Sequence, residues 1–316
     1  MIGVQGIKVQ LASTLRFAAR KGRFGLLLGL AAGVLLPDVA MALRPWLAEL
    51  VLLLLFFSSF RIGGSVVLQG IKAGGEPLKI ALILQLVLPL LALGVLTVLG
   101  VADSTFALAV LLMLSAPSVT GSPNFTILMG HKPEPAFRLL LIGTAILPIT
   151  MIPIFWLTPG LGDLGVSILS ALKLLVSILC AVGLAFWVRK VTLPDISEAQ
   201  TQAIDGLLVI LLAVIVIGLM SSLGPALIDT PLVVLSWLGL AFVLNLGLQT
   251  AAYFVFKWKG MSESAVPYAV VAGNRNFALF LLALPEASVE PLLIFLGCYQ
   301  IPMYLTPLIM QRLYKQ

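Results

Sequence analysis

The sequence predicts an all-α membrane protein with ten transmembrane helices, arranged as two inverted five-helix repeats. Of its 316 residues, 60% are hydrophobic and only 10% are charged, whereas an ordinary soluble domain is about 25% charged. Apolar segments follow one another along the chain without the alternation typical of a transmembrane β-barrel. Similarity between the fourth and ninth segments, and between the fifth and tenth, indicates an internal repeat.

The N-terminal stretch 1–23 is too polar to enter the bilayer. Ile7, Leu11 and Leu15 fall at helical spacing, and the basic residues lie off this stripe, which predicts an interfacial helix on the cytoplasmic leaflet. The alternative is a secretory signal, with a basic start, an apolar stretch at 24–36 and small residues at 39–42. Removal of the first span would unbalance the repeat, which favours the interfacial helix.

Ten apolar segments with short connections rich in Gly, Pro and charge are predicted to span the membrane. They cover residues 24–36, 45–60, 77–99, 105–129, 136–157, 166–188, 204–222, 230–256, 264–284 and 289–311. The first five form one predicted repeat, 24–157, and the last five form the other, 158–316. Helices are expected because every backbone polar group must be satisfied within the bilayer.

The distribution of Lys and Arg predicts the orientation. With the N-terminus in the cytoplasm, sixteen of the 19 basic residues fall on the cytoplasmic side, and Arg44 alone falls outside. Lys173 and Arg275 lie within spans, and Lys173 is expected to snorkel to the outer interface. This bias places both termini in the cytoplasm of a plasma membrane, the bacterial inner membrane. It also explains the net charge of +6 without a nucleic-acid partner.

The internal repeat consists of two motif pairs at nearly the same offset. Spans four and nine share Gly-x-x-Asn-Phe, as Gly121, Asn124, Phe125 and Gly273, Asn276, Phe277, and spans five and ten share Gly143, Pro148, Pro153 and Gly297, Pro302, Pro307. Because five spans is an odd number, the second half enters the membrane inverted. Inverted halves with interrupted spans are typical of alternating-access transporters. We therefore expect spans four and nine to unwind at their motifs.

Arg275 lies in the middle of the apolar segment 264–284, directly after Gly273 and Asn274. A guanidinium in hydrocarbon costs at least about 2.5–3.5 kcal/mol, so Arg275 is expected to line an aqueous or protein-filled cavity. The alternative is a structural arginine whose guanidinium is satisfied by backbone carbonyl groups.

The sequence lacks the characteristic residues of several enzyme classes. No Asp or Glu is predicted at bilayer depth, which argues against a proton relay, intramembrane aspartyl proteolysis and metal-dependent prenyl transfer. The only histidine, His131, falls in a predicted cytoplasmic loop, which argues against a Ser-His hydrolase. No phosphate-binding glycine loop is present. We expect neither an enzyme nor a cofactor.

Polar side chains without carboxylates cluster in the interrupted spans. They are Ser118, Thr120, Ser122, Asn124 and Thr126 in span four and Asn274, Arg275 and Asn276 in span nine, with Gln85 in span three and Gln300 in span ten. From this cluster we predict a substrate site formed by Arg275, Asn276, Asn274, Asn124, Thr126 and Gln300.

At these residues the sequence resembles the bile acid:sodium symporter family and its ten-helix relatives. The matching positions are Pro37-Asp38, Gln85, the stretch 117–126 and Gly273-x-x-Asn276. The resemblance implies a panel of spans one, two, six and seven, and a core of the other six in which spans four and nine cross at unwound centres. It also implies transport of amphipathic carboxylates or sulfates through a cavity between panel and core, with two sodium ions behind the crossing.

The departures from this pattern concern the sodium sites. Val271 stands where the family has a glutamate, and Arg275 stands where it has a glutamine; the Ser-Asn pair of span four becomes Ser122-Pro123, with Asn124 one place late. A fixed cation within ~4 Å of a sodium ion would cost several kcal/mol at a modest effective dielectric. Arg275 is therefore expected to replace a sodium ion or to contact the anionic substrate itself.

We predict a secondary active transporter that moves a small organic anion across the lipid bilayer by alternating access, with altered or absent sodium coupling. One alternative is a sodium-coupled symporter of bile-acid-like anions, with neutral oxygen ligands from Ser122, Asn124, Gln85 and Thr144. A second alternative is a membrane receptor that binds its ligand without transporting it. Substrate identity, transport direction and any oligomeric partner stay open.

Overall fold

The computed structural model describes residues 13–20, 22–64, 75–158, 161, 164–284 and 290–315. These residues are helical almost throughout and contain no strand, apart from one isolated bridge between Ser118 and Arg275. The protein is therefore all-α, as predicted. Residues 13–20 of the predicted interfacial helix are helical, whereas 1–12 and 21 lie outside the described residues.

Among the described residues, seven helices are long and apolar enough to cross a membrane, and on this ground the chain is an integral multi-pass membrane protein. They are Pro37–Ile62, Gly75–Val98, Glu134–Leu157, Leu164–Thr192, Glu198–Asp229, Pro231–Trp258 and Glu290–Tyr314. The three remaining predicted spans contain shorter helices. In 24–36 the helix has 14 residues, and the helices in 105–129 and 264–284 are interrupted.

The chain divides into two compact units, each drawn from both predicted repeats. Unit 1 comprises Met1–Val66 and Ser177–Asp229, and unit 2 comprises Val67–Val176 and Thr230–Gln316. Helix α11 (Leu164–Thr192) contributes its N-terminal part to unit 2 and its C-terminal part to unit 1. Compact packing and internal repetition are different properties, so the repeats 24–157 and 158–316 stay a prediction.

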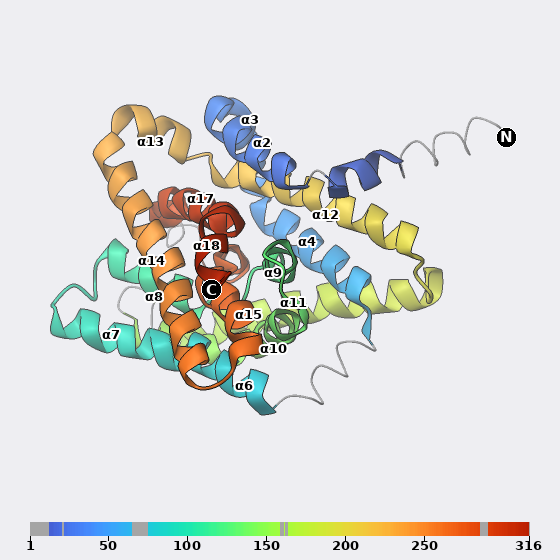
Figure 1. The fold of residues 1–316 in the computed structure, drawn as a ribbon. Coiled ribbons are helices and arrows are strands. Elements are labelled where there is room, and N and C mark those ends of the chain that lie inside the picture. The colour runs from blue at the N-terminus through green and yellow to red at the C-terminus, as the bar shows by residue number, and fades with distance from the viewer. Residues whose placement is uncertain are drawn as a thin grey trace. The chain divides into compact units, whose positions relative to one another are not determined.

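Unit 1 is built around close packing of α2 against α12 (Figure 1). Its elements are α2 (Gly22–Leu35), α3 (Pro37–Leu43), η1 (Arg44–Trp46), α4 (Leu47–Ile62), the end of α11, α12 (Glu198–Leu219) and α13 (Leu223–Asp229). Glycines on α2 face α12: a Cβ at Gly33 would lie 2.6 Å from the Cβ of Met220. Small residues of this kind let membrane helices approach closely.

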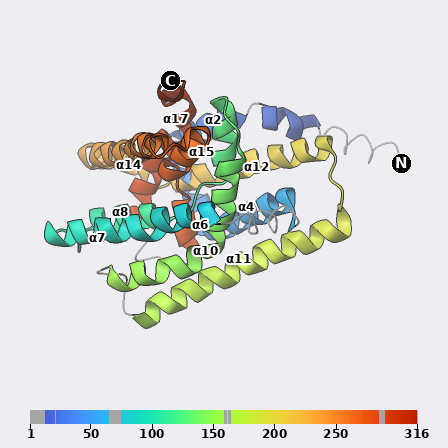
Figure 2. The same ribbon diagram turned by 60° about the horizontal axis from the view of Figure 1, so that its bottom comes forward.

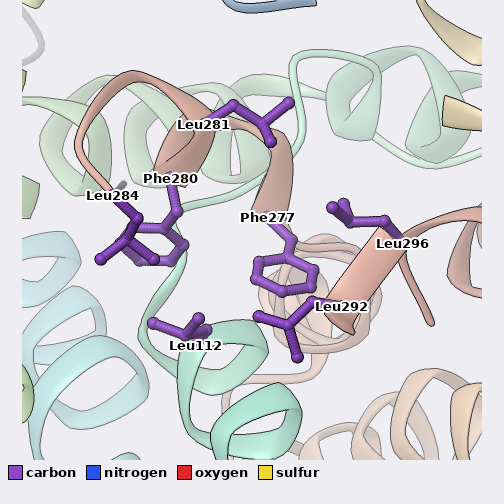
Figure 3. A pocket seen from close by; sticks show the side chains of 7 residues that line it. All are labelled: Leu112, Phe277, Phe280, Leu281, Leu284, Leu292 and Leu296. Carbon is purple, nitrogen blue, oxygen red and sulfur yellow. The ribbon is translucent and has the colours of Figure 1, made fainter. Parts of the chain in front are cut away.

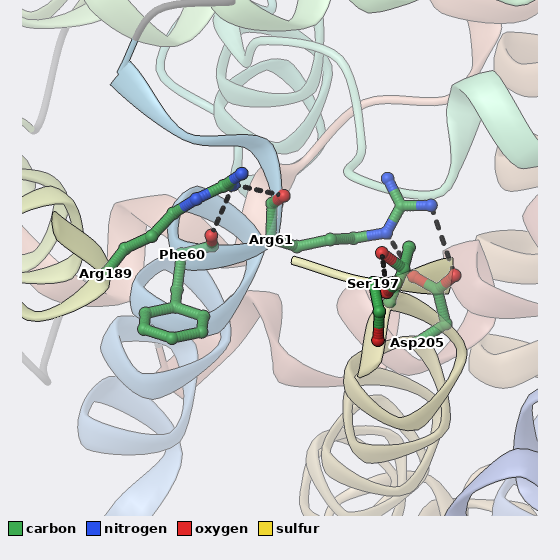
Figure 4. Close-up of polar contacts among 6 residues, drawn as sticks. Phe60, Arg61, Arg189, Ser197 and Asp205 are labelled. Carbon is green, nitrogen blue, oxygen red and sulfur yellow. Dashed lines mark hydrogen bonds and ion pairs between the residues drawn. The ribbon is translucent and has the colours of Figure 1, made fainter. Parts of the chain in front are cut away.

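Two arginines join α4, α11 and α12 at one end of unit 1 (Figure 4). The Arg61 guanidinium forms an ion pair with the Asp205 carboxylate, including an Nη2–Oδ2 hydrogen bond of 3.1 Å. Arg189 Nη1 donates to the carbonyl oxygens of Phe60 at 2.9 Å and Arg61 at 2.7 Å. These are last-turn carbonyls of α4, which have no intrahelical partner, so Arg189 caps that helix with a cation where its dipole is negative.

Unit 2 carries both interrupted segments. Its elements are α6 (Gly75–Leu82), the π-helical turn η2 (Ile83–Val87), α7 (Leu88–Val98), α8 (Thr105–Ser115), α9 (Ser122–Leu128), α10 (Glu134–Leu157), the start of α11, α14 (Pro231–Trp258), α15 (Ser262–Gly273), η3 (Phe277–Leu282), η4 (Glu290–Leu292), α17 (Leu293–Ile309) and α18 (Gln311–Tyr314). Helix α14 packs against α15 and α17, and α7 lies beside α8 (Figure 2). An apolar core joins α6, α10 and α15. The interruptions are thus held by several neighbouring helices.

Candidate functional site: two interrupted helices around Arg275

Both predicted interruptions are present, and the two non-helical stretches lie against each other. Residues 116–121 separate α8 from α9, and residues 274–276 separate α15 from η3. The Val119 N–H donates to the Asn274 carbonyl at 2.9 Å, and the Asn276 N–H donates to the Pro117 carbonyl at 2.7 Å. The backbone groups that leave the helical hydrogen-bond pattern therefore partly satisfy one another.

Proline explains the interruption after α8. A residue that precedes proline is disfavoured from the helical region, and Ala116, which precedes Pro117, is extended with φ −66° and ψ 150°. Pro117 also has no N–H to continue the helix. Pro123 falls in the first turn of α9, where the missing N–H has no cost.

A glycine ends α15, directly before the second interruption. Gly273 is the last residue of α15 and packs against α14. A Cβ at this position would collide with the backbone oxygen of Asn245 and the side chain of Gln249. The close approach of the two helices therefore requires glycine at 273.

The Arg275 side chain, 2% exposed, is bound by three backbone carbonyl groups. Its Nε donates to Ala272 at 2.8 Å, Nη1 donates to Ala116 at 3.0 Å, and Nη2 reaches Leu84 at 3.4 Å. Ala272 lies in the last turn of α15, Ala116 caps α8, and Leu84 lies in the π-helical turn η2. Carbonyls at helix C-termini lack intrahelical partners and carry partial negative charge. The guanidinium thus sits where a buried cation is best stabilised.

This geometry agrees with the alternative in which backbone carbonyls satisfy Arg275. The three carbonyl groups come from segments that are distant in sequence, and a cationic side chain of the protein itself can bind all three at once. Direct contact between the guanidinium and a substrate stays a prediction.

Val271 lies in apolar surroundings. Its side chain is 3% exposed and belongs to the core that contains Ile80, Leu84 and Ile142. This is the position at which the family resemblance implies a carboxylate. An unpaired carboxylate would be costly in such a core, so the local packing agrees with valine here.

A buried polar network holds the end of α15. Asn245 Nδ2 donates to the Gly273 carbonyl at 2.6 Å and to Asn274 Oδ1 at 3.1 Å, and the Tyr299 hydroxyl also donates to the Gly273 carbonyl. Gln249 Nε2 donates to Asn245 Oδ1 at 2.8 Å and to Thr306 Oγ1 at 3.0 Å. These bonds replace the partner that the Gly273 carbonyl would find in a continuous helix.

Sequence analysis missed Asn245, Gln249 and Thr306. The available signal was the pair Asn245 and Gln249, which lie four residues apart and hence on one face of the otherwise apolar α14. Polar side chains on one face of a membrane helix indicate a buried polar partner. The spacing alone does not say which helix supplies that partner.

The six predicted substrate residues separate into two groups. The side chains of Asn274 and Arg275 make the hydrogen bonds described above. Thr126 Oγ1 donates to the Ser122 carbonyl in its own helix, and Gln300 Nε2 donates to the Leu296 carbonyl in its own helix. Asn124 is exposed and Asn276 is partly exposed, and neither side-chain amide has a hydrogen bond among the described residues. These two asparagines are therefore the predicted residues with amides available to a ligand.

The four predicted sodium ligands also differ in their environments. Ser122 Oγ and Gln85 Oε1 are buried and find no hydrogen-bond partner among the described residues, whereas Asn124 is exposed and Thr144 is half-buried. A buried polar atom without a partner costs about 1–3 kcal/mol. Both oxygens could therefore ligate a sodium ion or bind water. The described residues contain no group of three or more His, Cys, Asp or Glu side chains suited to a metal.

A small pocket near η3 does not suit an organic anion. It has about 180 Å³ of empty volume and is lined by Leu112, Phe277, Phe280, Leu281, Leu284, Leu292 and Leu296 (Figure 3). Ligand sites usually include a few polar groups that orient the ligand, and this lining has no polar side chain.

No known protein-family model matches the chain, and no curated protein sequence matches it.

Proposed function

We propose that the protein is a secondary carrier that moves a small organic anion by alternating access and does not couple this movement to sodium. The observation that carries the proposal is the guanidinium of Arg275, bound by carbonyls where the two interrupted helices meet. A protein that served only as a membrane anchor would need no interrupted helices. Interrupted helices that meet in a membrane protein are typical of ion and substrate sites in transporters.

The division of the chain supports the proposed architecture. We infer ten spans in two inverted repeats, with a panel of spans one, two, six and seven and a core of the other six. Unit 1 contains the helices of spans one, two and seven and the end of span six, and unit 2 contains the others with both interruptions. Apart from the first part of span six, which falls in unit 2, this grouping is the one that a bile acid:sodium symporter-like fold would have. From the distribution of basic residues we infer that both termini lie on the cytoplasmic side of the inner membrane.

Electrostatics favours an anion at this site. At an effective dielectric of about 20, a negative charge ~6 Å from the guanidinium gains about 3 kcal/mol, and a sodium ion there loses as much. The carbonyl groups that could attract a cation already bind Arg275. We assign substrate contact to the amides of Asn124 and Asn276, while Arg275 acts on the substrate through its charge.

Uptake into proteoliposomes tests this proposal, with radiolabelled pyruvate and taurocholate as a small and an amphipathic probe. We expect uptake of at least one anion, equal in sodium and choline buffers. Asn124→Ala and Asn276→Ala should each reduce it about tenfold, because each removes a hydrogen bond to a charged group. Lys173→Ala removes an exposed charge from α11 and should leave uptake unchanged.

Two outcomes would contradict the proposal. Binding of an anion to the purified protein without any uptake would identify a receptor instead. Full activity of both asparagine variants would remove the site that we assign.

The unpartnered oxygens of Ser122 and Gln85 favour a second candidate, a sodium-coupled symporter of bile-acid-like anions. In that case sodium should raise the melting temperature of the wild type, since a ligand that binds only the folded state stabilises it. Ser122→Ala and Gln85→Leu should remove this effect. Equal melting temperatures in sodium and choline chloride would exclude this candidate.

A further inference from the structure

Arg275 is the one charged side chain that is buried among the described residues. Its side-chain hydrogen bonds go to backbone carbonyl oxygens, so no carboxylate of the described chain neutralises it. The described Asp and Glu residues are exposed, except for Asp205, which is half-buried and paired with Arg61. The interrupted helices therefore carry a positive charge that no carboxylate of the described residues compensates.

A charge fixed to the chain and a bound ion differ in how much charge they carry across the membrane in each cycle. A co-transported sodium ion leaves with the substrate, and its charge crosses the membrane in every cycle. The guanidinium stays with the protein and delivers no charge to either side. In the proposed sodium-independent carrier, with no described carboxylate buried beside Arg275 to carry a proton, the net charge moved in each cycle is that of the substrate.

From this difference we infer that the protein is an electrogenic anion uniporter, whose direction is set by the membrane potential and by the anion gradient. The inference rests on the proposed carrier function and deepens it. In a cell with a negative interior, the potential drives an anion outward. The protein then serves the export of an organic anion, whereas a symporter with two sodium ions per monovalent anion would import it.

The sign of the response to potential tests the inference. Proteoliposomes in sodium-free buffer receive valinomycin and a tenfold potassium gradient, and the probes are radiolabelled pyruvate and taurocholate. With high potassium outside, the interior becomes positive, and we expect a transported monovalent anion to approach a tenfold accumulation. With high potassium inside, the anion should be excluded to a similar extent. Replacing choline by sodium should change neither result.

The variant Lys173→Ala is the matched control, because it removes an exposed charge from α11, and it should behave as the wild type. Arg275→Gln keeps a hydrogen-bonding group without the charge, and we expect its sodium-independent flux to fall at least tenfold. The wild-type measurement stands by itself if this variant does not fold.

Each contrary result has a separate meaning. Sodium-dependent uptake driven by a negative interior would overturn the inference, because net positive charge would then enter with the anion. Uptake that does not depend on the membrane potential would also overturn the inference, since transport would then be electroneutral. If neither anion enters under any condition, the proposed carrier function fails, and this inference fails with it.

Discussion

Arg275→Ala is expected to lower the stability of the protein by about 3 kcal/mol, because three buried carbonyl groups lose their donor. A carbonyl left without a partner costs about 1–3 kcal/mol, and relief of the desolvated charge offsets part of the sum. The melting temperature in detergent should fall by on the order of 5–10 °C.

Chemical rescue separates loss of the cation from general damage. Guanidinium ion at low millimolar concentration should recover part of the lost melting temperature in Arg275→Ala and have no effect on the wild type. Lys173→Ala should keep the wild-type melting temperature. An unchanged melting temperature in Arg275→Ala would mean that the guanidinium does not hold the interrupted helices together.

Gly273→Ala is expected to be comparably severe, with a loss of about 3 kcal/mol from overpacking. The added Cβ would collide with the backbone oxygen of Asn245 as well as with the side chain of Gln249. Backbone cannot rotate away as a side chain can, so α15 would have to move off α14. That displacement would weaken the bonds from Asn245 to Gly273 and Asn274. Melting temperature and uptake should fall together.

Gly247→Ala on α14 is the matched control for this substitution. A Cβ at Gly247 meets nothing within 4 Å, and alanine is favoured over glycine within a helix by about 1 kcal/mol. This variant should be as stable as the wild type or slightly more stable. Equal stability of Gly273→Ala and Gly247→Ala would contradict the close packing of α14 on α15.

The interruptions could be predicted from sequence because their causes are local. Pro117 has no N–H and restricts the residue before it, and its effect on Ala116 is visible in the backbone angles. Gly273 and the polar residues after it stand out in an apolar segment. Apolar segments long enough to span a bilayer also predicted most of the long helices, although α2 is shorter than a full span.

The surroundings of Arg275 could not be predicted in the same way. Its guanidinium meets carbonyls of Leu84, Ala116 and Ala272, and backbone carbonyls leave no mark in a sequence. The choice between carbonyl contact and substrate contact therefore stayed open. The same holds for Asn245 and Thr306, whose partners come from different helices.

A density map at side-chain resolution of the protein in a lipid nanodisc tests the central claim most directly. It should show α15 ending at Gly273, with the guanidinium of Arg275 within hydrogen-bonding distance of the Ala116 and Ala272 carbonyls. A ninth segment that winds as one unbroken helix, with that guanidinium turned toward the acyl chains, would contradict the account.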